Sequence, residues 1–178
     1  MKQEWVIPAI SACVLFAMST AGIVPGMRTQ SPGERPRVAW KKYAEGREAA
    51  RANGKKVLID VYTTWCGWCR KMDREVYADS AVALYLDQHF VSVKLNAESA
   101  ETHEADGEKR TEKAIAAAYG ISSYPATVFL LPDGTPLTKV PGFIPRETFL
   151  HMLEYIATDA YKTTGWNAFL ASKRSGAH

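Results

Sequence analysis

The pattern of apolar and polar positions divides the chain into short strand-like runs and longer helix-like segments. Buried strands are predicted over Lys56–Tyr62 and Phe90–Leu95, where apolar residues, many of them β-branched, follow one another closely. Between these runs, the composition and spacing of Arg70–Tyr77 and Asp79–Gln88 favour helices. A strand, helical segments and a second strand in this order predict a parallel β-α-β unit and therefore an α/β domain.

Further elements are predicted on both sides of this unit. They are a helix over Trp40–Asn53, a helix over Thr111–Tyr119, a hairpin of Ala126–Leu131 with Leu137–Val140, a long helix with Pro145 in its first turn, and a tail helix around Trp166–Lys173. The long helix has an apolar stripe that is expected to face a core, formed by Phe149, Met152, Leu153, Ile156, Ala157 and Ala160. The polar segment Asn96–Glu108 contains five carboxylates and is predicted to be a solvated loop with His103 exposed.

The charge balance argues against nucleic acid as a partner. The 178 residues include 22 basic and 19 acidic side chains, which gives a net charge of +3. These charges are interleaved, and no basic stripe alternates with aromatic residues. The basic residues between Arg35 and Lys56 are therefore expected to lie on a solvated surface, and the length suits one domain with its own core.

The amino-terminal segment differs from the rest of the chain. Lys2 is its only basic residue, and residues 5–24 contain no charge. Small residues before Gly22 suit cleavage, so residues 1–21 are predicted to be a secretory signal. An uncleaved membrane anchor through residues 5–24 is the first alternative, and lipid attachment at Cys13 is another. All of these alternatives imply export to the periplasm or beyond.

A flexible linker is predicted over residues 22–39, because this stretch is rich in proline, glycine and polar residues. The folded domain is then expected over residues 40–178. Export leaves that domain with two cysteines, Cys66 and Cys69, directly after the first predicted strand. In an oxidising compartment two such thiols would pair by default.

Four chemistries compete for this cysteine pair. A structural disulfide over so short a loop would stabilise the fold little. A structural zinc site needs about four ligands, and the histidines show no ligand spacing, so no metal is expected. Covalent haem attachment requires His after the second cysteine, where Arg70 stands. Thiol–disulfide exchange is the leading interpretation, because two thiols at this spacing can open and close without unfolding the domain.

The sequence resembles the thioredoxin superfamily, in particular exported thioredoxin-like proteins and the periplasmic carboxy-terminal domain of transmembrane disulfide reductases. The resemblance rests on Trp65-Cys66-Gly67-Trp68-Cys69 after an apolar strand, Asp60 six residues before the first cysteine, Tyr124-Pro125 before a hairpin strand, and Gly142 before the last long helix. It extends from about residue 40 to 161. It implies a single thioredoxin-like domain, in which helices flank a mixed central sheet.

The resemblance also implies roles for three residues. Cys66 would be the exposed nucleophile that forms a mixed disulfide, and Cys69 would resolve it from a shielded position. Asp60, an acidic residue within an apolar strand, is expected to be buried and to prefer its neutral form. It could then carry the proton of Cys69, although an Asp that only caps or pairs locally is the alternative.

The same resemblance implies a surface that binds the substrate and a set of partners. The residues expected on that surface are Trp65, Gly67, Trp68, Tyr124, Pro125 and Gly142, with a cis peptide bond at Pro125. The partners would be client proteins with disulfides or dithiols and a membrane reductase that donates electrons, and no organic cofactor is implied. Reduction is favoured over oxidation or isomerisation. The alternative is a binding or chaperone module that uses its cysteines little.

Overall fold

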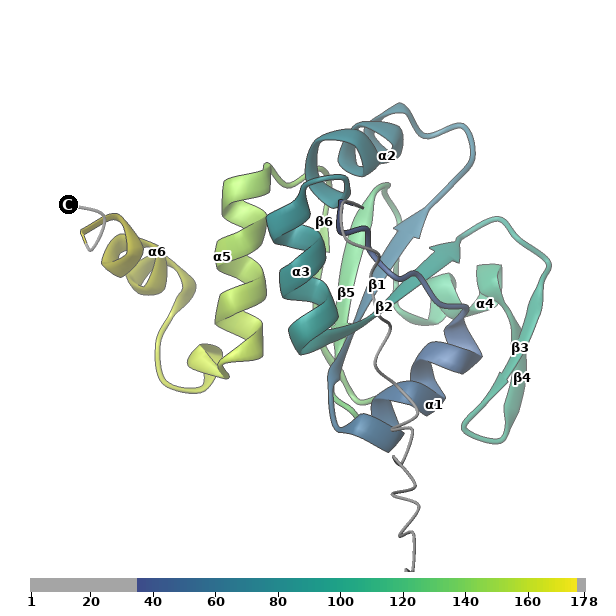
Figure 1. The fold of residues 1–178 in the computed structure, drawn as a ribbon. Helices are drawn as coiled ribbons and strands as arrows, with labels where there is room; N and C mark the ends of the chain where they lie inside the picture. The colour runs from purple at the N-terminus through teal and green to yellow at the C-terminus, as the bar shows by residue number, and fades with distance from the viewer. Residues whose placement is uncertain (1–34, 176–178) are drawn as a thin grey trace, which may run out of the picture. The chain divides into compact units, whose positions relative to one another are not determined.

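A four-stranded mixed sheet forms the centre of the computed structural model, which describes residues 35–175 (Figure 1). Its strands are β1 (Lys56–Tyr62), β2 (Phe90–Asn96), β5 (Ala126–Leu130) and β6 (Pro136–Pro141), in the order β2-β1-β5-β6. Strand β1 runs parallel to β2 and antiparallel to β5, and β5 is antiparallel to β6. The predicted mixed sheet, β-α-β unit and hairpin are therefore confirmed.

Helices cover both faces of this sheet. They are α1 (Tyr43–Asn53), α2 (Gly67–Met72), α3 (Ser80–His89), α4 (Glu112–Ala118), α5 (Arg146–Ala157) and α6 (Trp166–Ser175), with a π-helical segment η1 (Asp73–Tyr77) directly after α2 and a 3-10 turn η2 (Ala160–Lys162). The helix predicted from Trp40 begins later, because Lys41 makes backbone hydrogen bonds with Ser92 and Lys94 of β2 instead. The helix predicted from Arg70 begins earlier, directly after Cys66.

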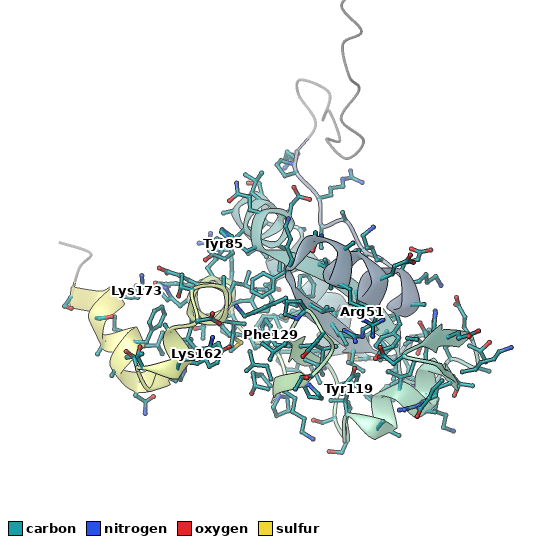
Figure 2. The ribbon with its side chains drawn as sticks, turned by 90° about the horizontal axis from the view of Figure 1, so that it is seen from below. Arg51, Tyr85, Tyr119, Phe129, Lys162 and Lys173 are labelled. Atoms are coloured by element: carbon teal, nitrogen blue, oxygen red, sulfur yellow. A yellow bond between two sulfur atoms is a disulfide. The ribbon has the colours of Figure 1, made fainter. Side chains whose placement is uncertain are left out.

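Alternation along β1 separates two apolar cores. Val57, Ile59 and Val61 face the core that α1 and α4 cover, whereas Leu58 faces the core beneath η1, α3 and α5. Figure 1 shows α3 and α5 together on one side of the sheet, and Figure 2 shows Phe129 of β5 in the interior. Because Asp60 is two residues from Leu58, its side chain points to the same face, beneath the helix that follows the cysteines.

The stripe predicted on the last long helix is confirmed in its central part. Phe149, Leu153 and Ile156 of α5 are buried in the second core. The remaining predicted positions of the stripe, Met152, Ala157 and Ala160, are only half-buried. Met152 and Ala157 nevertheless pack against the margin of the same core, so the part of the stripe that lies on α5 faces the core as predicted.

The prediction of a solvated loop over Asn96–Glu108 is wrong. Strands β3 (Thr102–Ala105) and β4 (Glu108–Thr111) form a separate antiparallel hairpin. Asp106 and Gly107 join them with φ angles of 59° and 77°, the left-handed conformation that this pair of residue types favours in tight hairpin turns. His103 is buried rather than exposed, because its Nε2 lies 3.2 Å from Oε1 of Glu112, at the start of α4.

The expectation that the basic residues between 35 and 56 are all solvated is also wrong at one position. Arg47 of α1 is fully buried. Its Nη2 donates to the backbone oxygen of Asp133 at 2.7 Å and lies 3.2 Å from a carboxylate oxygen of Asp106. The guanidinium therefore links α1 to the β3–β4 turn and to the turn between β5 and β6.

The predicted signal, anchor and lipid-attachment segments lie outside the described residues, as does most of the predicted linker. No helix within residues 35–175 combines the length and the apolar character needed to cross a bilayer.

Candidate functional site

One edge of the sheet collects every residue that the sequence marked as a candidate. Strands β1 and β2 end together there, since Tyr62 pairs with Asn96. Strand β5 begins and β6 ends at the same edge, since Ala126 pairs with Pro141. The segments after β1, β2 and β6 and the segment before β5 therefore converge, although they are far apart in the sequence.

Cys66 and Cys69 form a disulfide at this edge, with their Cα atoms 5.3 Å apart. Cys66 is the residue before the first turn of α2, and its Sγ accepts a hydrogen bond from the backbone N–H of Cys69 at 3.0 Å. The same N–H would favour a Cys66 thiolate once the bond is reduced. Cys66 was expected to be exposed and Cys69 to be shielded. This contrast is wrong for the oxidised form, in which Cys66 and Cys69 are 4% and 3% exposed, because the disulfide holds Cys66 at the start of the helix.

Asp60 is buried, as predicted, and it has a single strong partner. Its Oδ2 accepts a hydrogen bond from Lys94 Nζ at 2.8 Å, and its Oδ1 is buried without a partner among the described residues. Burial raises the pKa of the Asp60 carboxyl, and the charge of Lys94 opposes that rise only in part. The predicted burial is confirmed, and the pKa moves in the direction that favours the neutral form. The preference for that form and the role of Asp60 in proton transfer stay predictions.

Lys94 is a site residue that the sequence analysis missed. Its ammonium also pairs with Oδ1 of Asp73 in η1 and lies about 5 Å from the ring centres of Trp40 and Tyr62. Burial alone would lower the pKa of Lys94, but the Asp60 and Asp73 carboxylates outweigh that effect and raise it. A lysine inside an apolar strand was the available signal, and it could be interpreted only once the register with Asp60 was known.

Two exposed tryptophans stand beside the disulfide. Trp65 and Trp68 are 64% and 58% exposed, which agrees with the predicted exposure of Trp68. The edge of one ring of the Trp65–Tyr124 pair meets the face of the other, with centres 6.0 Å apart. Trp68 packs against Phe143, which follows β6, at 5.7 Å. Large apolar side chains are costly to leave in water, so this edge is suited to contact with another molecule.

The remaining predicted site residues also lie at this edge. The Tyr124–Pro125 peptide bond is cis, and Pro125 is buried. The backbone N–H of Gly142 donates to the oxygen of Pro125 at 2.7 Å, and its φ of 87° lies in the left-handed region that glycine tolerates. Gly67 is exposed between the two tryptophans in sequence. Their predicted roles in substrate binding stay predictions.

A group of possible metal ligands lies away from the disulfide. Ligand atoms of Glu101, His103 and Glu112 are within 4.8 Å of one another. Their polar atoms already have partners, since Lys42 Nζ lies 2.7 Å from Glu101 and the backbone N–H of Asn96 donates to Glu112. This arrangement is explained as the attachment of the β3–β4 hairpin to α4. The two cysteines are joined in a disulfide, so they offer no thiolate ligands in this state.

Comparisons with known proteins agree with this geometry. A family model described as a thioredoxin-like domain matches residues 43–157. The chain is 30% identical to the thiol:disulfide interchange protein DsbD of Ralstonia nicotianae over 111 residues, which are 61% of this chain and 17% of that protein. It is 25% identical to the disulfide bond reductase DsbH of Chlamydia pneumoniae over 107 residues, 60% of this chain and 63% of that protein.

A solved structure with a similar fold is a thioredoxin-fold protein from Helicobacter pylori. Its TM-score is 0.59 at 23% identity, and the match covers 70% of this chain and 82% of that one. This likeness concerns the fold. The matches to DsbD and DsbH cover less than two thirds of the length of either protein.

Proposed function

Because the chain belongs to the thioredoxin-like family, we propose that it is an exported thiol–disulfide oxidoreductase that reduces disulfide bonds in client proteins. One observation carries this proposal: the Cys66–Cys69 disulfide closes at the start of α2, next to two exposed tryptophans. A pair of this kind stores two electrons without any organic cofactor.

The proposed reaction has two exchange steps. The Cys66 thiolate attacks a client disulfide, so that a bond from Cys66 to one client sulfur forms and the client bond breaks, releasing the other client sulfur as a thiolate. Cys69 then gives its proton to the Asp60 carboxylate and attacks Cys66. The mixed disulfide breaks, the second client sulfur leaves as a thiolate, and the Cys66–Cys69 bond forms. The cysteine pair loses two electrons, and the client disulfide gains them.

The surroundings of Asp60 support its part in the second step. A buried carboxyl with a raised pKa has a greater tendency to take a proton than an exposed one. Lys94 stabilises the charged form of Asp60, which is the form that accepts the proton. Asp73, four residues after Cys69 on the same helical segment, also holds Lys94, so the lysine links the strand to the helix that carries Cys69.

The direction of electron flow and the location are parts of the same proposal. The similarity to a protein named as a disulfide bond reductase supports reduction. Each turnover leaves Cys66 and Cys69 oxidised, so a reductive enzyme needs a donor, for which we propose a membrane reductase. Export would use residues 1–21 as a signal or residues 5–24 as an anchor, with residues 22–39 as the linker to a domain over residues 40–178.

Trapping of mixed disulfides tests the function directly. The Cys69→Ser variant should accumulate species joined to clients through Cys66, while the matched Cys66→Ser variant should accumulate none. The wild-type protein should also reduce insulin, and a glutathione titration should give a potential nearer to about −270 mV than to about −120 mV. Absence of both trapped species and insulin reduction would overturn the proposal.

The exposed tryptophans also suit a module that binds clients without redox turnover. The Cys66→Ala variant separates the two functions. Under the proposed function it should lose insulin reduction completely and form no mixed disulfide. Two results together would favour the binding module: client complexes of the Cys66→Ala variant that are as stable as those of wild type, and a wild-type protein that reduces no insulin.

A further inference from the structure

The two tryptophans beside the disulfide have charged partners of opposite sign. On one side, both carboxylate oxygens of Glu98 lie 2.9 Å from the indole nitrogen of Trp65, whose N–H they accept. On the other side, the ammonium of Lys71 lies 5.0 Å from the ring centre of Trp68 and 4.9 Å from that of Phe143. Each aromatic surface is therefore held beside a full charge.

These charges lie on opposite sides of the disulfide. Glu98 follows β2 and Phe143 follows β6, and these strands are the two outer strands of the sheet. Both strands end at the same edge, so the strand ends from which the two segments emerge are about three strand spacings, or about 14 Å, apart. We call Trp65, Tyr124 and Glu98 the acidic side of the site, and Trp68, Phe143 and Lys71 the basic side.

Both charges remain available to another molecule. Within residues 35–175, no lysine or arginine forms an ion pair with Glu98. Among the same residues Lys71 has one acidic ion-pair partner, Glu75, at 3.8 Å, and their side chains are 37% and 52% exposed. Arg70, also exposed, adds a second positive charge next to the motif. A molecule bound across the disulfide would therefore meet a negative charge at one end and positive charge at the other.

From this pattern we infer that the site selects client segments in which an acidic and a basic residue stand on opposite sides of the cystine. The acidic residue would lie on the basic side, near Lys71, and the basic residue on the acidic side, near Glu98. Apolar residues next to the client cysteine would contact Trp65 and Trp68. The inference rests on the proposed function, since the bound segment is the client, and it adds the charge pattern by which the client is chosen.

Two peptides with reversed charges test this selection. In one peptide Glu stands before and Lys after the central position, which corresponds to the client cysteine. In the other peptide Lys stands before and Glu after it, and both peptides have the same apolar neighbours. Peptides with Ser at the centre are bound to the oxidised full-length protein at low salt, and affinities are measured by calorimetry. We expect one arrangement to bind about threefold more tightly, a size typical of two exposed charge pairs, and the difference to vanish in high salt.

Variants of the two charges identify the cause. The double variant Lys71→Glu with Glu98→Lys should reverse the preference. Glu98→Gln keeps an acceptor for Trp65 but removes the charge, so it should reduce the preference by about half. The matched control exchanges Glu104 and Lys109, which are cross-strand neighbours on the β3–β4 hairpin, and should leave the preference unchanged.

Equal affinities for the two peptides, an absence of binding, or a preference that survives the exchange of Lys71 and Glu98 would overturn the inference. Two further peptides with the same charges and a central Cys held in a disulfide are prepared, and their reduction is measured separately with the reduced wild-type protein. Turnover without a charge preference would leave the proposed function intact and refute the selection. Selective binding without any turnover would refute the proposed function and leave the charge selection intact.

Discussion

At the scale of single residues, the cost of burying charge decides how the site is built. Asp60 has one buried carboxylate oxygen without a hydrogen-bond partner among residues 35–175, and the ammonium of Lys94 pairs with both Asp60 and Asp73. An unpaired buried polar atom destabilises a fold, so this arrangement is expected to reduce the stability of the oxidised protein. The proton-transfer role proposed for Asp60 would therefore carry a cost in folding free energy.

This cost gives a prediction for the Asp60→Asn variant. Because the pKa of Asp60 is raised on folding, the wild-type protein loses stability as pH rises from the unfolded pKa through the folded one. The variant lacks this loss, so its unfolding free energy relative to wild type should increase as pH rises from below the ordinary aspartate pKa of about 3.9. Urea denaturation of the oxidised proteins measures it.

The control is Asp87→Asn, which removes an exposed carboxyl from α3. It should show a much smaller change over the same pH range. If Asp60→Asn instead loses stability relative to wild type as pH rises, the charged form of Asp60 stabilises the fold, and the assignment of a raised pKa is wrong.

Single residues also show what the sequence could not reveal. The burial of Asp60 was predictable, because an acidic residue interrupts an apolar strand and has nowhere else to point. Its partner Lys94 was not, since pairing depends on the register of two strands 34 residues apart. The contact between Trp65 and Glu98 was missed for the same reason, because Glu98 lies in a segment whose composition indicated only solvent exposure.

At the scale of elements, α1 packs so closely on β2 that one helical position has no room for a side chain. A Cβ atom added at Gly46 would lie 2.2 Å from Cγ2 of Val93, a buried residue with a stiff side chain. Glycine therefore stands in the middle of a helix, although it lowers helix stability there.

Gly46→Ala should consequently destabilise the protein. Overpacking of this kind costs about 1–3 kcal/mol, and the better helix propensity of alanine returns about 1 kcal/mol, so a net loss of about 1 kcal/mol is expected in chemical denaturation. Gly165→Ala is the control, because a Cβ there meets no atom within 4 Å, and it should change stability by less than about 0.5 kcal/mol. A Gly46→Ala protein that is more stable than wild type would mean that α1 moves freely on the sheet.

Elements also differ in how far the sequence reveals them. Strands β1 and β2 were predictable within a residue, because most of their residues are apolar and both of their faces are largely buried. The β3–β4 hairpin was not, since most of its side chains are polar and only His103 is buried in it. The usable signal was the Asp106-Gly107 pair, whose left-handed turn reverses the chain. Polar composition alone therefore indicates exposure, and exposure is compatible with a strand.

At the scale of the whole molecule, the site and the carboxy-terminal helix lie on different parts of the domain. The helix α6 packs on α5 through an aromatic group in which Phe169 and Trp166 lie 5.0 Å and 5.3 Å from the ring centre of Tyr155. Lys173 also pairs with Glu154 of α5. Figure 1 shows α6 beyond α5, away from α2, and the family match ends at residue 157, before this helix begins.

This separation predicts that loss of the α6 contact weakens the fold and leaves the chemistry unchanged. Phe169→Ala removes the buried ring of α6, so a loss of about 2 kcal/mol is expected, with faster hydrogen exchange in the amides of α6. The rate of insulin reduction should stay within about twofold of wild type. Among the described residues, the aromatic partners of Phe169 are Tyr155 of α5 and Trp166 of α6, and neither lies at the sheet edge that holds the disulfide. Asn167→Ala, exposed on the same helix, is the control and should alter neither property. A large fall in reduction rate with Phe169→Ala, in protein that remains folded, would show instead that α6 supports the geometry around Cys66.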